Sequence, residues 1–267
     1  PSYAASSIEN FALCEYLASH GYVVISSPSR GTENRWLEGG TKKDLETQAR
    51  DIEFLLKEAH HIPVADMDHL ATMGFSFGGL SNVLSQVRND AFDAIVSLDG
   101  SIKYQYAKLK NSPFFDIKKV DVPFIHMAQK KIPEQVLEED DIDPLLDTNF
   151  EFYDELIYSK AYQLKFTRLS HSYFSSLGVL FGQRDQRQDA GDGEIMTSYR
   201  LVTEYTLHFL DAFLKDKRDG MEFLDNPPDR NGVPDGFVQH MSKEPEPIGF
   251  SFQDWNELAA DQQYEAL

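Results

Sequence analysis

The sequence predicts an α/β protein whose mostly parallel sheet carries helices on both faces. Short runs rich in β-branched and aromatic residues alternate with longer amphipathic segments from residue 1 to about 215. Several of the short runs are apolar throughout, as are strands that a parallel sheet buries on both faces. The chain has 267 residues, of which 41% are hydrophobic, and this is enough for one sizeable core.

The amphipathic segments predict the helices. In residues 8–20 apolar side chains recur at i, i+3 and i+4, and Gly21 follows as a stop signal. The same spacing predicts further helices over residues 45–60, 80–87 and about 205–214. In the second of these, Ile52, Leu55 and Leu56 share one face.

Short apolar runs between these helices predict the strands. They are rich in Val, Ile and aromatic residues and are bounded by Gly, Pro or Asp. The predicted strands are 22–27, 69–75, 93–100, 122–129 and 161–169.

Two segments interrupt the alternation. Residues 130–152 hold an acidic run and two prolines between two predicted strands, which indicates an insertion or cap. Its composition is compatible with a lid and with a solvated loop. From residue 216 the chain becomes rich in Pro, Gly and Asp, so we expect a linker-like segment and a C-terminal tail over 216–267. The α/β domain is then expected over 1–215.

Composition and charge narrow the possible partners. The formal net charge is −19 and no long Lys/Arg run occurs, which argues against a nucleic-acid or anionic-membrane partner. No apolar run reaches the 18 or so residues of a membrane-spanning helix. The single cysteine, Cys14, excludes an internal disulfide and a thiolate metal cluster. The cellular location and the oligomeric state stay open.

One short motif carries chemistry. Residues 74–78 read Gly-Phe-Ser-Phe-Gly, which satisfies the pattern G-x-S-x-G, and they lie between a predicted strand and a predicted helix. In this context the serine occupies a sharp, strained turn, and the glycines let neighbouring backbones approach closely. Ser76 is therefore the candidate nucleophile, and the amide of Phe77 at the start of the helix is a candidate oxyanion donor.

A nucleophilic serine needs a base and an orienting acid, in the chain order Ser, acid, His for this turn. Of the eight histidines, four precede the serine and three others fall in a predicted strand, a helix or the tail. His171, directly after the last predicted strand, remains as the base. Asp99 ends the strand after the motif, and the next strand offers no carboxylate until Glu134, so Asp99 is the candidate acid.

Four stretches together carry a family resemblance: LASHGYVVISSPSRG, GFSFGG, SLDGS and LSHSYF. They resemble the platelet-activating-factor acetylhydrolase branch of the α/β-hydrolases and the dienelactone-hydrolase-like esterases. The resemblance spans about residues 1–215, which makes this segment the expected catalytic domain. It implies a serine esterase with Ser76 as nucleophile, His171 as general base and Asp99 as orienting acid. This mechanism needs no metal and no organic cofactor.

The resemblance also implies a role for the first residues. Pro1-Ser2-Tyr3 falls where the family has its oxyanion loop, with Pro and Ser in place of the usual His and Gly. The Tyr3 amide would then be the second oxyanion donor, beside that of Phe77. The strands that normally come before this loop would lie ahead of residue 1, so we expect the catalytic domain to be N-terminally incomplete.

The predicted function is hydrolysis of a carboxylic ester with a short or medium acyl chain, and the expected partner is a small-molecule ester. A serine peptidase of the same fold and a non-catalytic binding module on a hydrolase scaffold remain as alternatives. Aromatic residues near the motif are candidates to line an acyl pocket, although such residues more often pack a core: Phe75, Tyr104, Tyr173 and Phe174.

Overall fold

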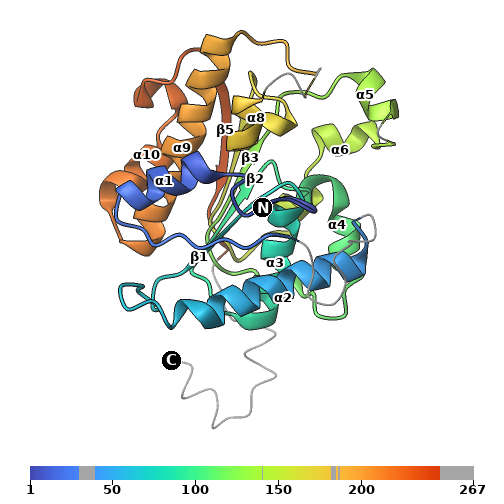
Figure 1. The fold of residues 1–267 in the computed structure, drawn as a ribbon. Helices are drawn as coiled ribbons and strands as arrows, with labels where there is room; N and C mark the ends of the chain where they lie inside the picture. The colour runs from blue at the N-terminus through green and yellow to red at the C-terminus, as the bar shows by residue number, and fades with distance from the viewer. Residues whose placement is uncertain (30–39, 140, 182–184, 186, 247–267) are drawn as a thin grey trace, which may run out of the picture.

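A computed structural model describes residues 1–29, 40–139, 141–181, 185 and 187–246. Its centre is a five-stranded sheet of order β1-β2-β3-β4-β5 (Figure 1). The first four strands are parallel and the fifth is antiparallel to the fourth. The strands are β1 (Ala71–Phe75), β2 (Ala94–Leu98), β3 (Phe124–Ala128), β4 (Ala161–Phe166) and β5 (Val238–Lys243).

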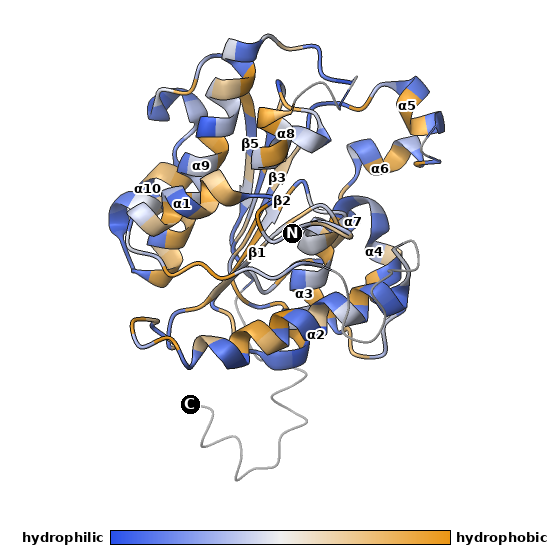
Figure 2. Ribbon diagram, viewed as in Figure 1, coloured by the Kyte–Doolittle hydropathy of each residue, from blue (hydrophilic) through white to orange (hydrophobic). Residues whose placement is uncertain are grey.

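Helices cover both faces of the sheet, and each face has its own cluster of buried apolar side chains. The helices α1 (Phe11–Ser19), α9 (Asp192–Leu214) and α10 (Arg218–Asp225) contribute to one cluster or pack against it. The other cluster includes residues of α2 (Lys42–Ala59), α3 (Phe77–Asn89) and α4 (Ile102–Lys110). Figure 2 shows this arrangement of mixed-polarity helices around largely apolar strands. It confirms the predicted fold class.

The sheet register brings three strand ends together. Phe75 of β1 lies opposite Leu98 of β2, and Leu98 lies opposite Met127 of β3. The residues that follow these strands therefore meet at the carboxyl edge of the sheet, where open α/β sheets bind their ligands. All five residues of β2 are buried, as expected for a strand covered on both faces.

Shorter elements connect these parts. The insertion between β3 and β4 contains α5 (Glu134–Glu139), α6 (Pro144–Thr148) and α7 (Glu151–Glu155). Two further short helices follow β4, namely η2 (His171–Phe174) and α8 (Ser176–Leu180). Isolated 3₁₀ turns occur at η1 (Ile117–Lys119) and η4 (Pro228–Asn231). In the described part of the chain no helix is both long and apolar enough to cross a membrane.

One predicted strand is wrong. Residues 22–27 are extended but form no strand. The backbone of residues 23–28 makes no backbone hydrogen bond to any other residue that the structure describes. The β-branched run favours an extended backbone, but a strand also needs a hydrogen-bonded neighbour, and none of the described strands pairs with this segment.

The expected linker-like segment is also wrong over residues 218–243. They form α10, η4 and β5, and β5 completes the sheet beside β4. The Pro and Gly residues that suggested a linker make tight turns instead, with Gly232 and Gly236 both at a φ of 72°. β5 is an edge strand with few buried residues, so its sequence carries a weak signal. The rest of the expected tail, 247–267, lies outside the described residues.

The packing of α10 on α9 gives a test of this correction. A Cβ added at Gly220 would lie 2.6 Å from the carbonyl oxygen of His208 and 2.9 Å from the nitrogen of Ala212. We expect Gly220→Ala to lower the free energy of unfolding by about 1–3 kcal/mol, measured by urea denaturation. The control is Gly193→Ala in α9, where nothing lies within 4 Å and stability should rise by up to about 1 kcal/mol. Equal changes in unfolding free energy for the two substitutions would mean that α10 does not pack against α9 at Gly220.

Candidate active site

The candidate nucleophile occupies the turn between β1 and α3. Ser76 has a φ of 54° and a ψ of −122°, a conformation that is costly for a residue with a side chain. The turn is tight because the two flanking glycines touch: a Cβ at Gly74 would lie 2.3 Å from the carbonyl carbon of Gly78. The sequence thus fixes a strained serine at the carboxyl edge of the sheet.

Ser76, His171 and Asp99 form a continuous chain of hydrogen bonds. Nε2 of His171 lies 3.0 Å from Oγ of Ser76, and Nδ1 lies 2.5 Å from Oδ2 of Asp99. Asp99 is fully buried directly after β2, whereas about a third of the His171 side chain is exposed. The three residues come from three separate loops at one sheet edge. This is the arrangement in which an imidazole can take a proton from a hydroxyl while a carboxylate orients it.

Gln129 supports two members of this chain, and sequence reasoning missed it. Its backbone N–H donates to Oδ1 of Asp99 at 2.9 Å, and its side-chain Oε1 accepts from the His171 N–H at 3.1 Å. Gln129 follows β3 directly. Its place at the carboxyl end of a predicted strand was the one signal that could have found it.

Asp185 supports the histidine loop from the other side. Its Oδ2 accepts from the Ser170 hydroxyl at 2.5 Å and from the Ser172 N–H at 3.4 Å. Burial works to raise the pKa of Asp185, but these hydrogen bonds and Arg187 hold it below its ordinary value. A charged carboxylate therefore anchors the residues on both sides of His171. No local sequence pattern marks it.

The two residues that carry the predicted oxyanion donors contact each other through their rings. The Phe77 amide is at the first position of α3, where no intrahelical carbonyl can accept from it. The Tyr3 ring packs edge-on against the Phe77 ring, with centroids 5.6 Å apart. Tyr3 therefore lies beside the turn, and its role as second oxyanion donor stays a prediction.

The predicted pocket aromatics differ in position. The centre of the Phe75 ring lies 4.8 Å from that of the His171 ring. Tyr173 follows His171 closely in the sequence, and its side chain is buried. Burial raises the pKa of Tyr104, which keeps this phenol neutral. Phe174 is fully buried and packs edge-on against Phe166. Its ring packs in the core, and the expectation that Phe174 lines a pocket stays a prediction.

A buried histidine lies behind Asp99. His126 of β3 is fully buried and shares a 2.9 Å hydrogen bond between its Nδ1 and Oγ of Ser97. Burial is the main cause of a pKa lowered to about 3; Asp99 partly opposes this shift and Lys103 adds to it. His126 is therefore neutral at pH 7. In the described residues no group of three or more His, Cys, Asp or Glu side chains is arranged to hold a metal ion.

The depressed pKa of His126 predicts acid destabilisation. The unfolded chain binds this proton near pH 6.5 and the folded chain near pH 3, so the contribution to stability is full above pH 6.5 and is lost as the pH falls. Each pH unit removes about 1.4 kcal/mol of unfolding free energy. His126→Asn should show a shallower decline in urea titrations between these limits. Carboxylates titrate in both proteins, so an identical decline would contradict the assignment.

Residues 10–124 match the model of the prolyl oligopeptidase family. No curated protein matches the sequence. Ser76 and Asp99 lie inside the matched segment, and His171 lies beyond it. The match does not confirm the resemblance to the acetylhydrolase branch that the four sequence stretches suggested. Together with the sheet and the turn at Ser76, it supports a serine hydrolase of the α/β-hydrolase fold.

Proposed function

We propose that this chain hydrolyses a carboxylic ester with a short or medium acyl chain through an acyl-enzyme on Ser76. The hydrogen-bond chain from Asp99 through His171 to the Ser76 hydroxyl carries the proposal. The strained turn supports it, because such strain persists mainly at functional sites. An acyl transfer with this machinery needs no metal and no organic cofactor.

The reaction follows from the geometry in two steps. The Ser76 Oγ attacks the ester carbonyl while Nε2 of His171, 3.0 Å away, takes its proton. His171 then passes the proton to the leaving alkoxide as the tetrahedral intermediate collapses to the acyl-enzyme. A water molecule then attacks the acyl-enzyme while His171 takes its proton. His171 returns this proton to Oγ of Ser76, which leaves as the acid product forms.

Charge stabilisation comes from both ends of the site. The Phe77 and Tyr3 amides are assigned to the oxyanion, and one such donor contributes about 3–4 kcal/mol in related chemistry. The buried Asp99 carboxylate stabilises the imidazolium that forms on His171 and selects the tautomer with a proton on Nδ1.

A serine peptidase is the second candidate, because the matched family is that of prolyl oligopeptidase. The same three residues could cleave an amide. We favour the ester because ester carbonyls react more readily and their alkoxide leaving groups depart more easily than amines. Substrate preference therefore has to be measured on both classes.

Labelling with a fluorophosphonate probe tests the nucleophile. We expect one adduct by intact mass, which Ser76→Ala removes because no other serine that the structure describes is hydrogen-bonded to a histidine oriented by a carboxylate. The control is Ser19→Ala at the exposed end of α1, which should label like the parent chain. No adduct on a folded parent protein would favour the non-catalytic binding module. On the unlabelled parent protein, turnover of p-nitrophenyl esters without cleavage of dipeptide anilides supports the esterase, and the reverse supports the peptidase.

Replacement of the acid tests the triad itself. Asp99→Asn keeps the shape of the side chain but removes the charge that selects the His171 tautomer. We expect kcat for a p-nitrophenyl ester to fall by about 10⁴-fold with little change in KM. A fall of less than about tenfold would show that another group orients His171.

A further inference from the structure

The loop that carries Tyr3 is held by two polar side chains. The peptide unit between Pro1 and Ser2, here called the clamped peptide, is fixed at both of its ends. Its carbonyl oxygen accepts from Nε2 of Gln48 in α2 at 2.9 Å, and its N–H donates to Oε2 of Glu9 at 2.6 Å. The Ser2 hydroxyl donates to the other oxygen of the same carboxylate at 2.6 Å. Three hydrogen bonds therefore set the plane of this peptide and the conformation of Ser2.

The next peptide unit, between Ser2 and Tyr3, takes its direction from these contacts. Its carbonyl oxygen accepts from the Ala5 N–H at 3.4 Å. Ala4 lies inside this turn and has a φ of 54°, which is uncommon for a residue with a side chain. Strain of this kind persists where the surroundings determine the backbone, and it gathers at functional sites. The direction of the Tyr3 N–H is therefore set by a tight turn whose first peptide is clamped.

The clamped peptide lies directly against the nucleophile turn. A Cβ added at Gly78 would lie 2.4 Å from the Pro1 carbonyl oxygen. Gln48, which holds this carbonyl, is 4% exposed, and its Oε1 accepts from the Ser81 hydroxyl of α3 at 2.9 Å. One buried side chain therefore ties the loop of Tyr3 to the helix that begins at Phe77.

Glu9 also connects this loop to the segment that carries the candidate base. Its backbone carbonyl accepts from the Leu177 N–H of α8 at 3.2 Å. Oδ1 of the neighbouring Asn10 accepts from the Ser176 N–H, also at 3.2 Å. α8 follows η2, which begins at His171. Hydrogen bonds therefore set the position of Glu9 relative to the base as well.

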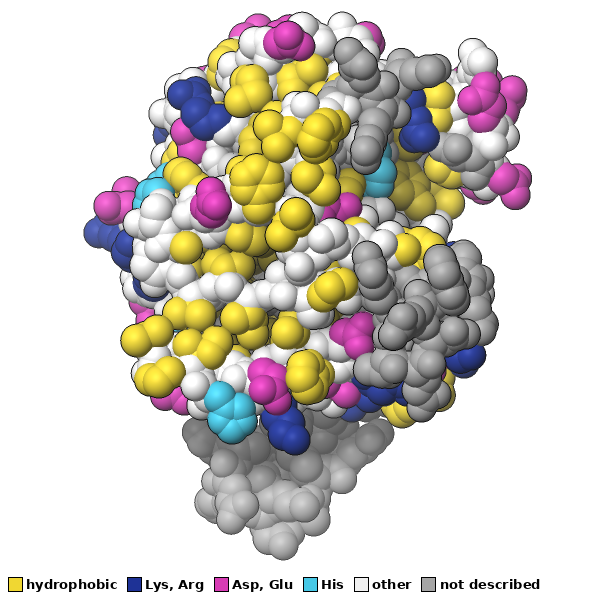
Figure 3. All heavy atoms as spheres, in the orientation of Figure 1, with side chains coloured by type: hydrophobic (Ala, Val, Ile, Leu, Met, Phe, Trp, Pro, Cys, Tyr) yellow, Lys and Arg dark blue, Asp and Glu magenta, His cyan; other side chains and the backbone are white. Residues whose placement is uncertain are grey.

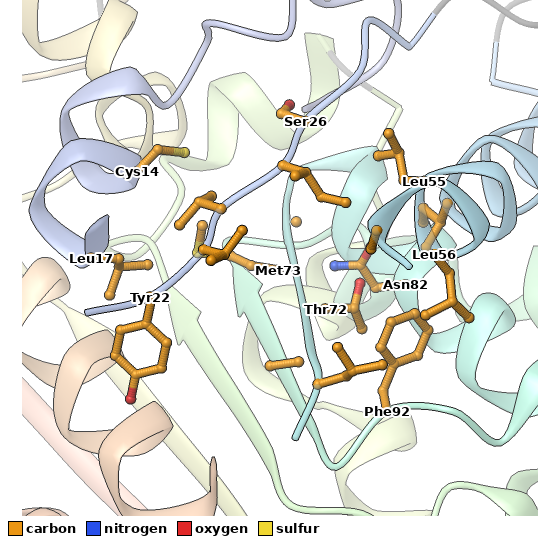
Figure 4. Close-up of a pocket in the computed structure, with 18 of the residues that line it drawn as sticks. Cys14, Leu17, Tyr22, Ser26, Leu55, Leu56, Thr72, Met73, Asn82 and Phe92 are labelled. Atoms are coloured by element: carbon orange, nitrogen blue, oxygen red, sulfur yellow. The ribbon is translucent and has the colours of Figure 1, made fainter. Parts of the chain in front are cut away.

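A cavity of about 370 Å³ beside β1 makes these polar contacts decisive. Pro1, Glu9 and Gln48 line one part of it. The rest of the lining is largely apolar, and Figure 4 shows leucine side chains of α1 and α2 around the cavity. Hydrophobic side chains also gather on the surface of this region, at the lower left of Figure 3. The loop gains little close packing on the cavity side, and hydrogen bonds in apolar surroundings are stronger than in water. They therefore decide where the loop lies.

We propose that Glu9 and Gln48 are positioning residues for the oxyanion donor on Tyr3. Both act through the clamped peptide, which sets the direction of the Tyr3 N–H. A donor that is already oriented stabilises a developing charge because it needs no rearrangement when the charge forms. The inference rests on the proposed reaction at Ser76, since the donor is used only when a tetrahedral oxyanion forms there.

The kinetics of Glu9→Ala test the role in catalysis. We expect kcat for a p-nitrophenyl ester to fall by about tenfold or more, within the loss of about 10²–10³-fold that removal of a whole oxyanion donor causes, and KM to change little. Affinity for a trifluoromethyl ketone, whose adduct on Ser76 carries the same oxyanion, should fall by a similar factor. Glu9→Gln should restore most of the rate, because an amide can accept from the Ser2 N–H and donate to the Ser2 hydroxyl. Glu15→Ala, at an exposed position of α1, is the matched control.

Gln48→Met tests the other end of the clamped peptide. It removes the donor to the Pro1 carbonyl and the acceptor for Ser81 without burying a charge. We expect the same fall in kcat at nearly constant KM. Because both side chains hold one peptide, the double variant with Glu9→Ala should lose less than the product of the two single losses. Losses that multiply would show that the two residues act independently, which contradicts the clamp.

Nitrogen-15 relaxation of the Tyr3 amide separates this inference from the proposed function. We expect its order parameter to fall in Glu9→Ala from about 0.85 to the flexible range below about 0.6, whether or not an ester is turned over. An unchanged order parameter would overturn the inference, and so would unchanged kcat and inhibitor affinity in folded Glu9→Ala. If the Tyr3 amide is loosened but the parent chain neither reacts with the fluorophosphonate nor turns over esters or anilides, the proposed function has failed. Glu9 and Gln48 would then have a purely structural role.

Discussion

The contact between the backbones of Gly74 and Gly78 is the constraint on which the site depends. It lets α3 begin directly after β1, with only Ser76 between them. A second close contact joins the backbones of Gly79 in α3 and Gly100 after β2: a Cβ at Gly79 would lie 2.7 Å from the Gly100 Cα. The loops that carry Ser76 and Asp99 are thereby pressed together. Side chains at these glycines would separate the nucleophile from its acid.

Hydrogen bonds then fix what the backbone brings close. Asp99 is fully buried, and a buried carboxylate must be paired. One of its oxygens accepts from the Gln129 backbone and the other from His171, so each oxygen has a hydrogen-bond partner. Gln129 in turn holds the His171 backbone. Geometry and electrostatics are therefore coupled: the residue that satisfies the acid also positions the base.

Local patterns predicted much of this molecule because local rules govern it. The turn at Ser76 was predicted from the spacing of its glycines. The partners of Ser76 were predicted from the chain order Ser, acid, His, after the other histidines had been set aside by their position. Strand pairing is different, because it depends on what lies alongside. Residues 22–27 have the composition of a strand but no pairing partner. The composition of β5 is less typical of a strand, yet β5 pairs with β4. Asp185 was beyond prediction for the same reason, since its contacts with Ser170 and Ser172 depend on the path of the intervening chain.

The open edge of β1 and the strained turn at Ser76 are parts of one strand. Strained backbone persists only where its surroundings determine it more strongly than local preference does. β1 is held by β2 on one side, and α3 packs against it from one face. On the other side its backbone faces a cavity. The stiffness of the nucleophile turn is therefore linked to how firmly β2 and α3 hold β1. Stability of this part of the sheet and precision at Ser76 then depend on the same contacts of β1 with β2 and α3.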